Sequence, residues 1–406
     1  MTAIAETSDR PTIDDRLARR NALVLALAQA LAGGNNTVLV ATGGIVGAML
    51  APDKGLATVP ISVYVVGMWL GTLPMGVLAR RLGRRNAFQI GTVFGVITGV
   101  LCYAAVMRES FLLFNVGALT SGLYASAHVA YRFAAADTAS EAFRPKAISW
   151  VLLGGIFSGI VGPQLIIATK DLLPPYLFAA TYLAQAGLAI VSSLVLMLIR
   201  IPRPAPVAAV GTGRSLGAIA RQPRFIVAVI CGVASFAMMN MVMTSAPLAM
   251  VMCQHSVEDA TLGLQWHVIA MFAPSLFTGA LISRLGVERI VITGLSLIVA
   301  SAVVGLSGTT IWHFWTALVL LGVGWNFGFV GATTMVTACH RPNERNKVQA
   351  FNDFLVFGTM AIGSFSSGKL LADFGWSAVN GVVLPVVLAA GALLLWNWSR
   401  SRPQAV

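Results

Sequence analysis

The chain has 406 residues, of which 57% are hydrophobic and only 10% are charged. Soluble proteins carry about 25% charged residues, so this composition excludes a large soluble protein, which would lack the polar side chains to cover its surface. The net charge of +12 does not indicate nucleic-acid binding, because the basic residues lie in short polar breaks between apolar runs and no aromatic side chains alternate with them.

Apolar runs near the bilayer-spanning length of about 20 residues recur along the whole chain and predict an all-α membrane protein. They are too long and too uniformly apolar for barrel strands. The first twenty residues are polar and lack the apolar core of a signal peptide. In chain order, we expect twelve transmembrane helices at 22–50, 59–79, 87–106, 111–136, 147–169, 176–199, 225–252, 262–282, 290–307, 311–338, 348–371 and 376–398.

Basic residues and a repeat predict how these helices are organised. With the N-terminus in the cytoplasm, 23 of the 27 Lys and Arg residues fall on the inner side, which predicts that both termini are cytoplasmic. The segment "GVLARRLGRRN" (76–86) recurs as "GALISRLGVER" (279–289), which indicates a duplicated six-helix unit. We therefore expect a cytoplasmic N-tail at 1–20, a six-helix bundle at 21–199, a cytoplasmic linker at 200–224, a second six-helix bundle at 225–398 and a cytoplasmic C-tail at 399–406.

The repeated segment resembles the loop signature of the major facilitator superfamily, G-x-L-A-D-R-x-G-R-R. The resemblance covers nearly the whole chain and implies the twelve-helix fold of that superfamily, built from two six-helix halves. One position departs, because the family has Asp where this chain has Arg80, and the second copy has Ser283. In the family that carboxylate helps to hold the halves together on the cytoplasmic side. Asp137 and Glu141 are candidates to replace it, or are solvated loop charges.

Few charges lie inside the predicted helices. Of the 15 acidic residues, Asp353 alone falls within a helix, near its inner end, and Arg132 has a similar position. Because a buried charge in a membrane is costly and usually functional, a cargo held by fixed opposite charges is not expected. Methionine offers neutral, soft ligands instead, and six of the 15 methionines lie between Met238 and Met252.

Two spacings sharpen this observation. Met239 and Met243 are four residues apart and share one face of the seventh helix, and His267 and Met271 have the same spacing on the eighth. Met243 and Met271 each lie nine residues from the outer end of their helix, which places both at a depth of about 14 Å. Three thioethers and an imidazole suit Cu(I), whereas methionine clusters elsewhere often only fill gaps in packing.

The M-x3-M and H-x3-M pairs are similar to those of CcoA-like copper importers, which belong to the major facilitator superfamily. This resemblance implies a bacterial inner-membrane protein that moves copper by alternating access and serves cytochrome oxidase assembly, with copper as its substrate and no separate cofactor. It implies a cytoplasmic copper acceptor as partner, and no nucleic acid. The implied metal ligands are Met239, Met243, His267 and Met271, with Cys231 and Cys253 as auxiliary thiols along the path.

Other interpretations stay open at this point. Relatives of these importers take up riboflavin, so a carrier of riboflavin or a drug-like molecule is the alternative, and a copper sensor is a third. No nucleophile–base pair, phosphate loop or catalytic carboxylate pair indicates an enzyme. Three further sites are candidates. An outer capture site for metal would be formed by Met250, Met252, Cys253 and His255, and an inner release site by Cys339 and His340. His128 is a candidate proton carrier.

Overall fold

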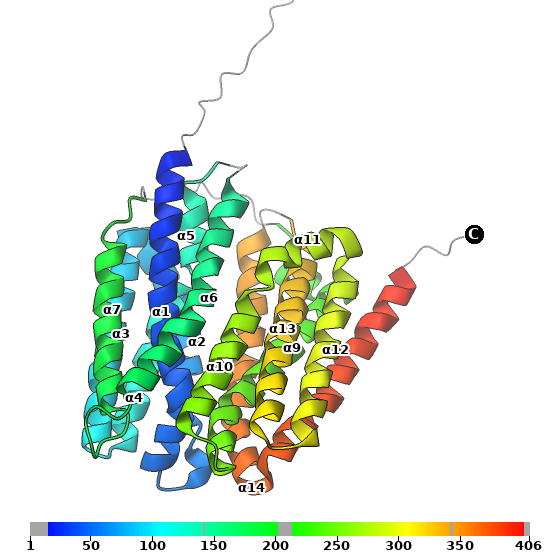
Figure 1. The fold of residues 1–406 in the computed structure, drawn as a ribbon. Coiled ribbons are helices and arrows are strands. Elements are labelled where there is room, and N and C mark those ends of the chain that lie inside the picture. Colours follow the sequence, from blue (N-terminus) through cyan, green and yellow to red (C-terminus); the bar gives the residue numbers. More distant parts are fainter. Residues whose placement is uncertain (1–14, 141–142, 202–212, 342–343, 402–406) are drawn as a thin grey trace, which may run out of the picture.

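The computed structural model describes residues 15–140, 143–201, 213–341 and 344–401. Within these ranges the chain is helical and has no strand (Figure 1). The predicted all-α fold is therefore confirmed. The helices are α1 (Asp15–Leu50), η1 (Lys54–Leu56), α2 (Val59–Leu82), α3 (Arg84–Met107), α4 (Phe111–His128), α5 (Tyr131–Asp137), α6 (Arg144–Thr169), α7 (Ala179–Leu196), α8 (Leu216–Ala220), α9 (Pro223–Met252), α10 (Val257–Phe272), α11 (Ser275–Leu285), α12 (Val287–Ser307), α13 (Ile311–Thr337) and α14 (Arg345–Ser401).

All twelve predicted spans lie on these helices, with three departures in detail. The span 111–136 is interrupted between α4 and α5. The span 262–282 is divided between α10 and α11, which are bent by 42° beside Pro274, whose missing N–H interrupts the helical hydrogen bonds. The last two spans are joined in α14, which contains a non-helical residue, Gly375, at φ 76°. Among the described residues, nine helices are long and apolar enough to cross a membrane, or ten with the bent pair, so twelve crossings stay a prediction.

The helices form two groups that lie side by side, α1–α7 and α9–α14 (Figure 1). Each has buried apolar clusters of its own, one built around Tyr124 and Tyr131 and the other around Met239 and Trp325. Small residues let the helices approach closely, as is common in membrane proteins. A side chain at Gly122 of α4 would lie 2.1 Å from the carbonyl oxygen of Tyr64 on α2, so this contact requires glycine.

The groups are joined at the end of the molecule that contains η1, which we call the η1 end. There the Ser62 hydroxyl of α2 donates to Ser364 of α14 over 2.9 Å. The ammonium of Lys170, just after α6, lies 2.8 Å from Glu258 of α10. Hydrogen bonds to Asp171 and then to Glu258 raise the pKa of Lys170 above its ordinary value, so this lysine stays charged across the physiological range. These contacts close the η1 end between the two groups.

The opposite end, where α1 begins and α2 meets α3, we call the basic end. Two ion pairs there each stay within one group. Arg84 donates to Asp137 over 2.9 Å, and Arg224 lies 3.1 Å from Glu288. Asp137 therefore pairs within its own group in this arrangement, and Glu141 lies outside the described residues, so a carboxylate that replaces the missing loop Asp stays a prediction.

The segment before α8 is attached to the start of α14. Arg214 makes a two-pronged contact with Glu344, with Nη2 2.7 Å from Oε2 and Nε 3.0 Å from Oε1. The Glu344 side chain is fully buried. Hydrogen bonds from Arg214 and from the backbone of Arg341 hold the pKa of Glu344 well below its ordinary value, so the carboxylate stays ionised and fixes this part of the predicted linker to the second group.

Candidate functional site

A cavity of about 450 Å³ lies between the two groups of helices. It begins near Ile61 and Tyr64 of α2 and extends to the basic end, where Arg84, Arg132 and Phe133 line it. A smaller space of about 160 Å³ shares Tyr64 and several further lining residues with it, so the two adjoin each other. Pockets for small organic ligands have volumes of roughly 300–1,000 Å³, and the larger cavity falls within that range.

Five aromatic side chains of the second group form one wall of the cavity, which we call the aromatic wall: Phe236, Phe272, Trp325, Phe329 and Phe357. Phe236 lies at its centre, with ring centroids 5.4 Å from Trp325 and 4.8 Å from Phe329 in edge-to-face contacts. Trp325 and Phe329 are stacked at 5.4 Å with an interplanar angle of 16°. Such a surface suits a flat, aromatic ligand, because aromatic rings prefer offset-stacked and edge-to-face contacts.

Two hydrogen-bond donors in the second group border the same cavity without a partner. They are the amide nitrogen of Asn240 on α9 and the indole nitrogen of Trp325 on α13. Both atoms are buried, and neither has a hydrogen bond within the described part of the chain. Since buried polar groups in folded proteins nearly always have partners, these two donors indicate that a ligand with acceptor atoms completes the wall.

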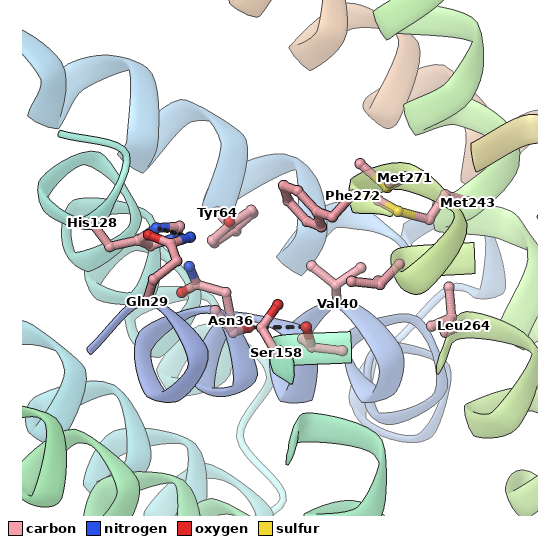
Figure 2. Close-up of a pocket in the computed structure, with 13 residues that line it drawn as sticks. Gln29, Asn36, Val40, Tyr64, His128, Ser158, Met243, Leu264, Met271 and Phe272 are labelled. Atoms are coloured by element: carbon pink, nitrogen blue, oxygen red, sulfur yellow. Dashed lines mark hydrogen bonds between the residues drawn. The ribbon is translucent and has the colours of Figure 1, made fainter. Parts of the chain in front are cut away.

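The first group contributes a different surface to the smaller space. We call it the polar pocket, formed by Gln29, Asn36, His128 and Ser158 (Figure 2). The Gln29 amide nitrogen lies 3.5 Å from His128 Nδ1, and the Ser158 hydroxyl donates to the carbonyl of Gly155 over 2.6 Å. The site therefore has an aromatic side and a hydrogen-bonding side, which come from different groups of helices.

Charges lie near the mouth of the cavity at the basic end. Arg132 of α5 and Asp353 of α14 both line it and interact electrostatically. The Arg132 guanidinium carbon lies 4.8 Å from the centroid of the Phe133 ring, and Asn352 donates to Asp353 over 3.2 Å. The two opposite charges come from different groups of helices, and the residues that line the smaller space carry no acidic or permanently basic side chain.

Three of the six predicted metal ligands line the cavity. Met239, Met243 and Met271 are among its lining residues, and Figure 2 shows Met243 and Met271 as neighbours beside Phe272. His267 lines neither space. It is fully buried, and its Nδ1 lies 2.7 Å from the carbonyl oxygen of Leu318 on α13.

The two predicted auxiliary thiols also lie away from the cavity. Cys231 is buried within the second group, with its sulfur 3.8 Å from the carbonyl oxygen of Ala390. Cys253 follows the last residue of α9 at the η1 end, where burial raises the pKa of its thiol. Neither cysteine is among the lining residues, so the structure does not bring the six candidates together.

The remaining candidates are dispersed. His128 does line the cavity. His255 Nε2 lies 2.8 Å from the Thr309 carbonyl at the η1 end, and Met250 is buried while Met252 is exposed. At the basic end Cys339 donates to the carbonyl of Met335, and His340 Nδ1 lies beside the carbonyl of Arg341. Among the described residues, no three His, Cys, Asp or Glu side chains are grouped so that they could hold a metal ion.

Sequence reasoning missed the aromatic wall. The segment "WNFGF" contains Trp325 and Phe329 four residues apart, the same spacing that singled out the methionines, and Phe236 is four residues before Asn240. These spacings place the side chains on shared helix faces. They were not distinctive in a membrane protein, because aromatic residues are also common on surfaces that face lipid and at helix contacts.

The chain is similar in sequence and in structure to known transporters. The sequence profile of the Major Facilitator Superfamily matches residues 25–272 and 229–406. The riboflavin transporter RfnT of Brucella anthropi is 50% identical over 376 residues, which cover 92% of this chain and 94% of that protein. An uncharacterised transporter of the same superfamily from Bacillus subtilis, YddS, is 27% identical over 98% of this chain and 95% of its own length. The crystal structure of a mutant of the nucleoside transporter NupG has a TM-score of 0.68 at 15% identity, covering 95% of this chain and all of that one.

The prediction that the chain imports copper is wrong. The relative that shares half of its residues over nearly the full length is a riboflavin transporter. The physical reason lies in the ambiguity of methionine, whose flexible thioether serves as an adaptable apolar surface as readily as a metal ligand. Without copper as cargo, the assignment of a ligand set, a copper acceptor and a role in cytochrome oxidase assembly has no support.

Proposed function

The chain belongs to the Major Facilitator Superfamily, and we propose that it carries riboflavin, or a closely related flavin, across the membrane. The observation that carries this proposal is the aromatic wall of a 450 Å³ cavity between the two groups of helices. The name of the 50% identical relative supports the same substrate. The proposal also fits the uncharged lining of the smaller space, because riboflavin is uncharged at neutral pH.

Riboflavin consists of a flat, fused-ring isoalloxazine and a hydroxylated chain. The ring stacks on the aromatic wall, and Met239, Met243 and Met271 pack against it as adaptable apolar contacts. Stacking of a heteroaromatic ring on an aromatic side chain contributes about 1–3 kcal/mol per ring by alanine substitution. The unpartnered nitrogens of Asn240 and Trp325 donate hydrogen bonds to the carbonyl oxygens of the ring.

The arrangement is one stage of an alternating-access cycle. The η1 end is closed between the groups, and the cavity reaches the basic end. The concentration of Lys and Arg at the basic end favours a cytoplasmic location for it, in a bacterial inner membrane with both termini inside. The cavity then faces the cytoplasm, as in a carrier that releases its cargo inward, and rocking of one group against the other exposes it to the outside.

The proposal is tested by uptake of radiolabelled riboflavin into bacteria that cannot synthesise the vitamin and lack a carrier of their own. We expect the unmodified chain to give saturable uptake and growth at low riboflavin concentration. Trp325→Ala is expected to raise the KM for riboflavin by about 5- to 150-fold, since it removes a stacking contact of about 1–3 kcal/mol. Trp325→Phe keeps an aromatic ring and should retain most of the affinity.

Trp312→Ala is the matched control. Trp312 lies at the start of α13 at the η1 end, is 69% exposed and does not line the cavity, so its replacement should leave KM unchanged. Absence of saturable riboflavin uptake by the unmodified chain, at normal amounts of protein in the membrane, would refute the proposal. Equal uptake by Trp325→Ala and the unmodified chain would show that the aromatic wall is not part of the binding site.

A further inference from the structure

The two sides of the cavity differ in the kind of hydrogen bond that they offer. On the aromatic wall and beside it, the unpartnered nitrogens Asn240 Nδ2 and Trp325 Nε1 are both donors. The polar pocket instead contains two amides, an imidazole and a hydroxyl, in Gln29, Asn36, His128 and Ser158, and each of these groups both donates and accepts. The two unpartnered donor atoms suit carbonyl oxygens, whereas groups that both donate and accept suit hydroxyl groups.

Asn36 is the residue of the polar pocket whose side chain lacks any partner. It is 6% exposed, and within the described residues neither its amide nitrogen nor its amide oxygen has a hydrogen bond. It borders the smaller space, and Figure 2 shows its amide on the same side as Gln29 and His128, away from Phe272 and Met271. A buried amide with both ends unpaired is rare in folded proteins and indicates a ligand.

The neighbouring residue, Asn35, differs from Asn36 because its side chain has hydrogen-bond partners. Asn35 donates to the carbonyl of Gln185 on α7 over 2.8 Å, and the Gln185 amide returns hydrogen bonds to the carbonyl and side-chain oxygens of Asn35. Asn35 therefore joins α1 to α7 and has a structural role. Asn36 lies on the side of α1 that faces the cavity, where no described helix satisfies its amide.

The two parts of the cavity also differ in volume. The part that contains the aromatic wall has a volume of about 450 Å³, whereas the extension beside Asn36 has about 160 Å³. The smaller volume suits a flexible chain of hydroxyl-bearing carbons, and the larger volume suits a rigid fused-ring system.

We propose that the cavity is a two-part site for isoalloxazines with a hydroxylated side chain, in which the second group of helices holds the ring and Asn36 on the first group recognises the hydroxyls. This inference rests on the proposed function as a flavin carrier. Both groups of helices must then contact one ligand at the same time. Binding of the ring together with its hydroxylated chain therefore depends on how the two groups are positioned relative to each other.

The test compares two ligands. Riboflavin carries the hydroxylated chain, and lumiflavin is the same ring with a methyl group in its place. Dissociation constants of both are measured by fluorescence quenching on the purified full-length protein. We expect lumiflavin to bind the unmodified protein about tenfold more weakly, because a site built for hydroxyls loses its partners. Asn36→Leu, which keeps the number of side-chain heavy atoms and the branching at Cγ, should weaken riboflavin by about tenfold and change lumiflavin by less than about twofold.

Two controls separate specificity from damage. Trp325→Ala should weaken both flavins alike, because both contain the ring. Asn115→Leu replaces another asparagine with a buried, unpartnered amide oxygen that does not line the cavity, and should change neither constant. Asn36→Ser replaces the amide by one hydroxyl, which still donates and accepts, and should give intermediate discrimination; it provides a second variant if Asn36→Leu is poorly folded by size-exclusion chromatography.

The outcomes distinguish this inference from the function on which it rests. Selective loss of riboflavin binding in Asn36→Leu, with lumiflavin unchanged, supports the two-part site. Equal binding of the two flavins by the unmodified protein, or equal weakening of both by Asn36→Leu, overturns the two-part site and leaves the flavin carrier standing. If the unmodified protein binds neither flavin, the proposed function fails and the two-part site fails with it.

Discussion

Gly368 of α14 provides a sharp test of how the η1 end is closed. It lies against Thr58, the residue before α2, at a point where the two groups of helices meet. A side-chain carbon at position 368 would lie 2.1 Å from the Thr58 hydroxyl oxygen and 3.1 Å from two of its carbons. Thr58 is fully buried and its hydroxyl donates to the Ser364 carbonyl over 3.4 Å. Rotation of the Thr58 side chain brings either its methyl group or its Cβ hydrogen to the place of the oxygen, and Cβ itself stays 3.1 Å away, so the contact remains tight in every rotamer.

Gly368→Ala is therefore expected to push the two groups apart at the η1 end. Overpacking by one carbon in a close contact costs roughly 1–3 kcal/mol, and this cost applies to the closed arrangement alone. The equilibrium between closed and open η1 ends should shift towards the open state by about 5- to 150-fold. A carrier with a modest preference for the closed state would then populate the open state detectably.

The measurement is a distance distribution between two spin labels. Leu112, at the start of α4, and Trp312, at the start of α13, are 75% and 69% exposed and lie at the η1 end on different groups. Labels are attached to cysteines at these positions in a background without the four native cysteines. Double electron–electron resonance on Gly368→Ala should show an additional population at longer distance than on the parent protein.

Gly358→Ala is the matched control on the same helix. A side-chain carbon there meets nothing within 4 Å, so its distance distribution should equal that of the parent. Adding Thr58→Ala to Gly368→Ala removes the overlapping atoms and should restore the parent distribution. An unchanged distribution in Gly368→Ala, with the protein folded, would refute the conclusion that this contact holds the η1 end closed.

Two further predictions concern charges at the basic end. Asp353→Asn removes the negative charge that interacts with Arg132 across the mouth of the cavity. Initial rates of riboflavin uptake should then fall several-fold, while the dissociation constant of riboflavin stays within about twofold of the parent value. If riboflavin binding weakens as much as the uptake rate falls, Asp353 belongs to the binding site instead. Glu344 has a pKa held below its ordinary value of 4.5 by Arg214, so its ionised form stabilises the fold above about pH 4.5 and that contribution is lost as the pH falls towards its lowered pKa. Glu344→Gln should lower the Tm at pH 7, and the difference from the parent should shrink below about pH 4.5; a difference in Tm independent of pH would contradict this.

Much of the architecture can be predicted from the amino-acid sequence alone. In a bilayer the backbone must satisfy its own hydrogen bonds, so each long apolar run dictates helical structure, and the predicted spans lie on helices apart from the breaks between α4 and α5 and beside Pro274. The scarcity of charges within those runs similarly predicts that the cargo is not held by fixed opposite charges, because a buried charge is too costly to occur without a function. These properties depend on local composition and on the solvent, and both can be read along the chain.

The composition of the site depends on tertiary packing. A four-residue spacing shows that His267 and Met271 share one side of α10, but it does not show which neighbour that side contacts. In the folded chain Met271 borders the cavity, while the His267 ring lies against α13. The aromatic wall is assembled from four helices, and its members extend from Phe236 to Phe357 in the sequence. Each helix can rotate about its axis without changing its own hydrogen bonds, so only the packing of all the helices together decides which side chains meet in the cavity, and therefore which cargo it accepts.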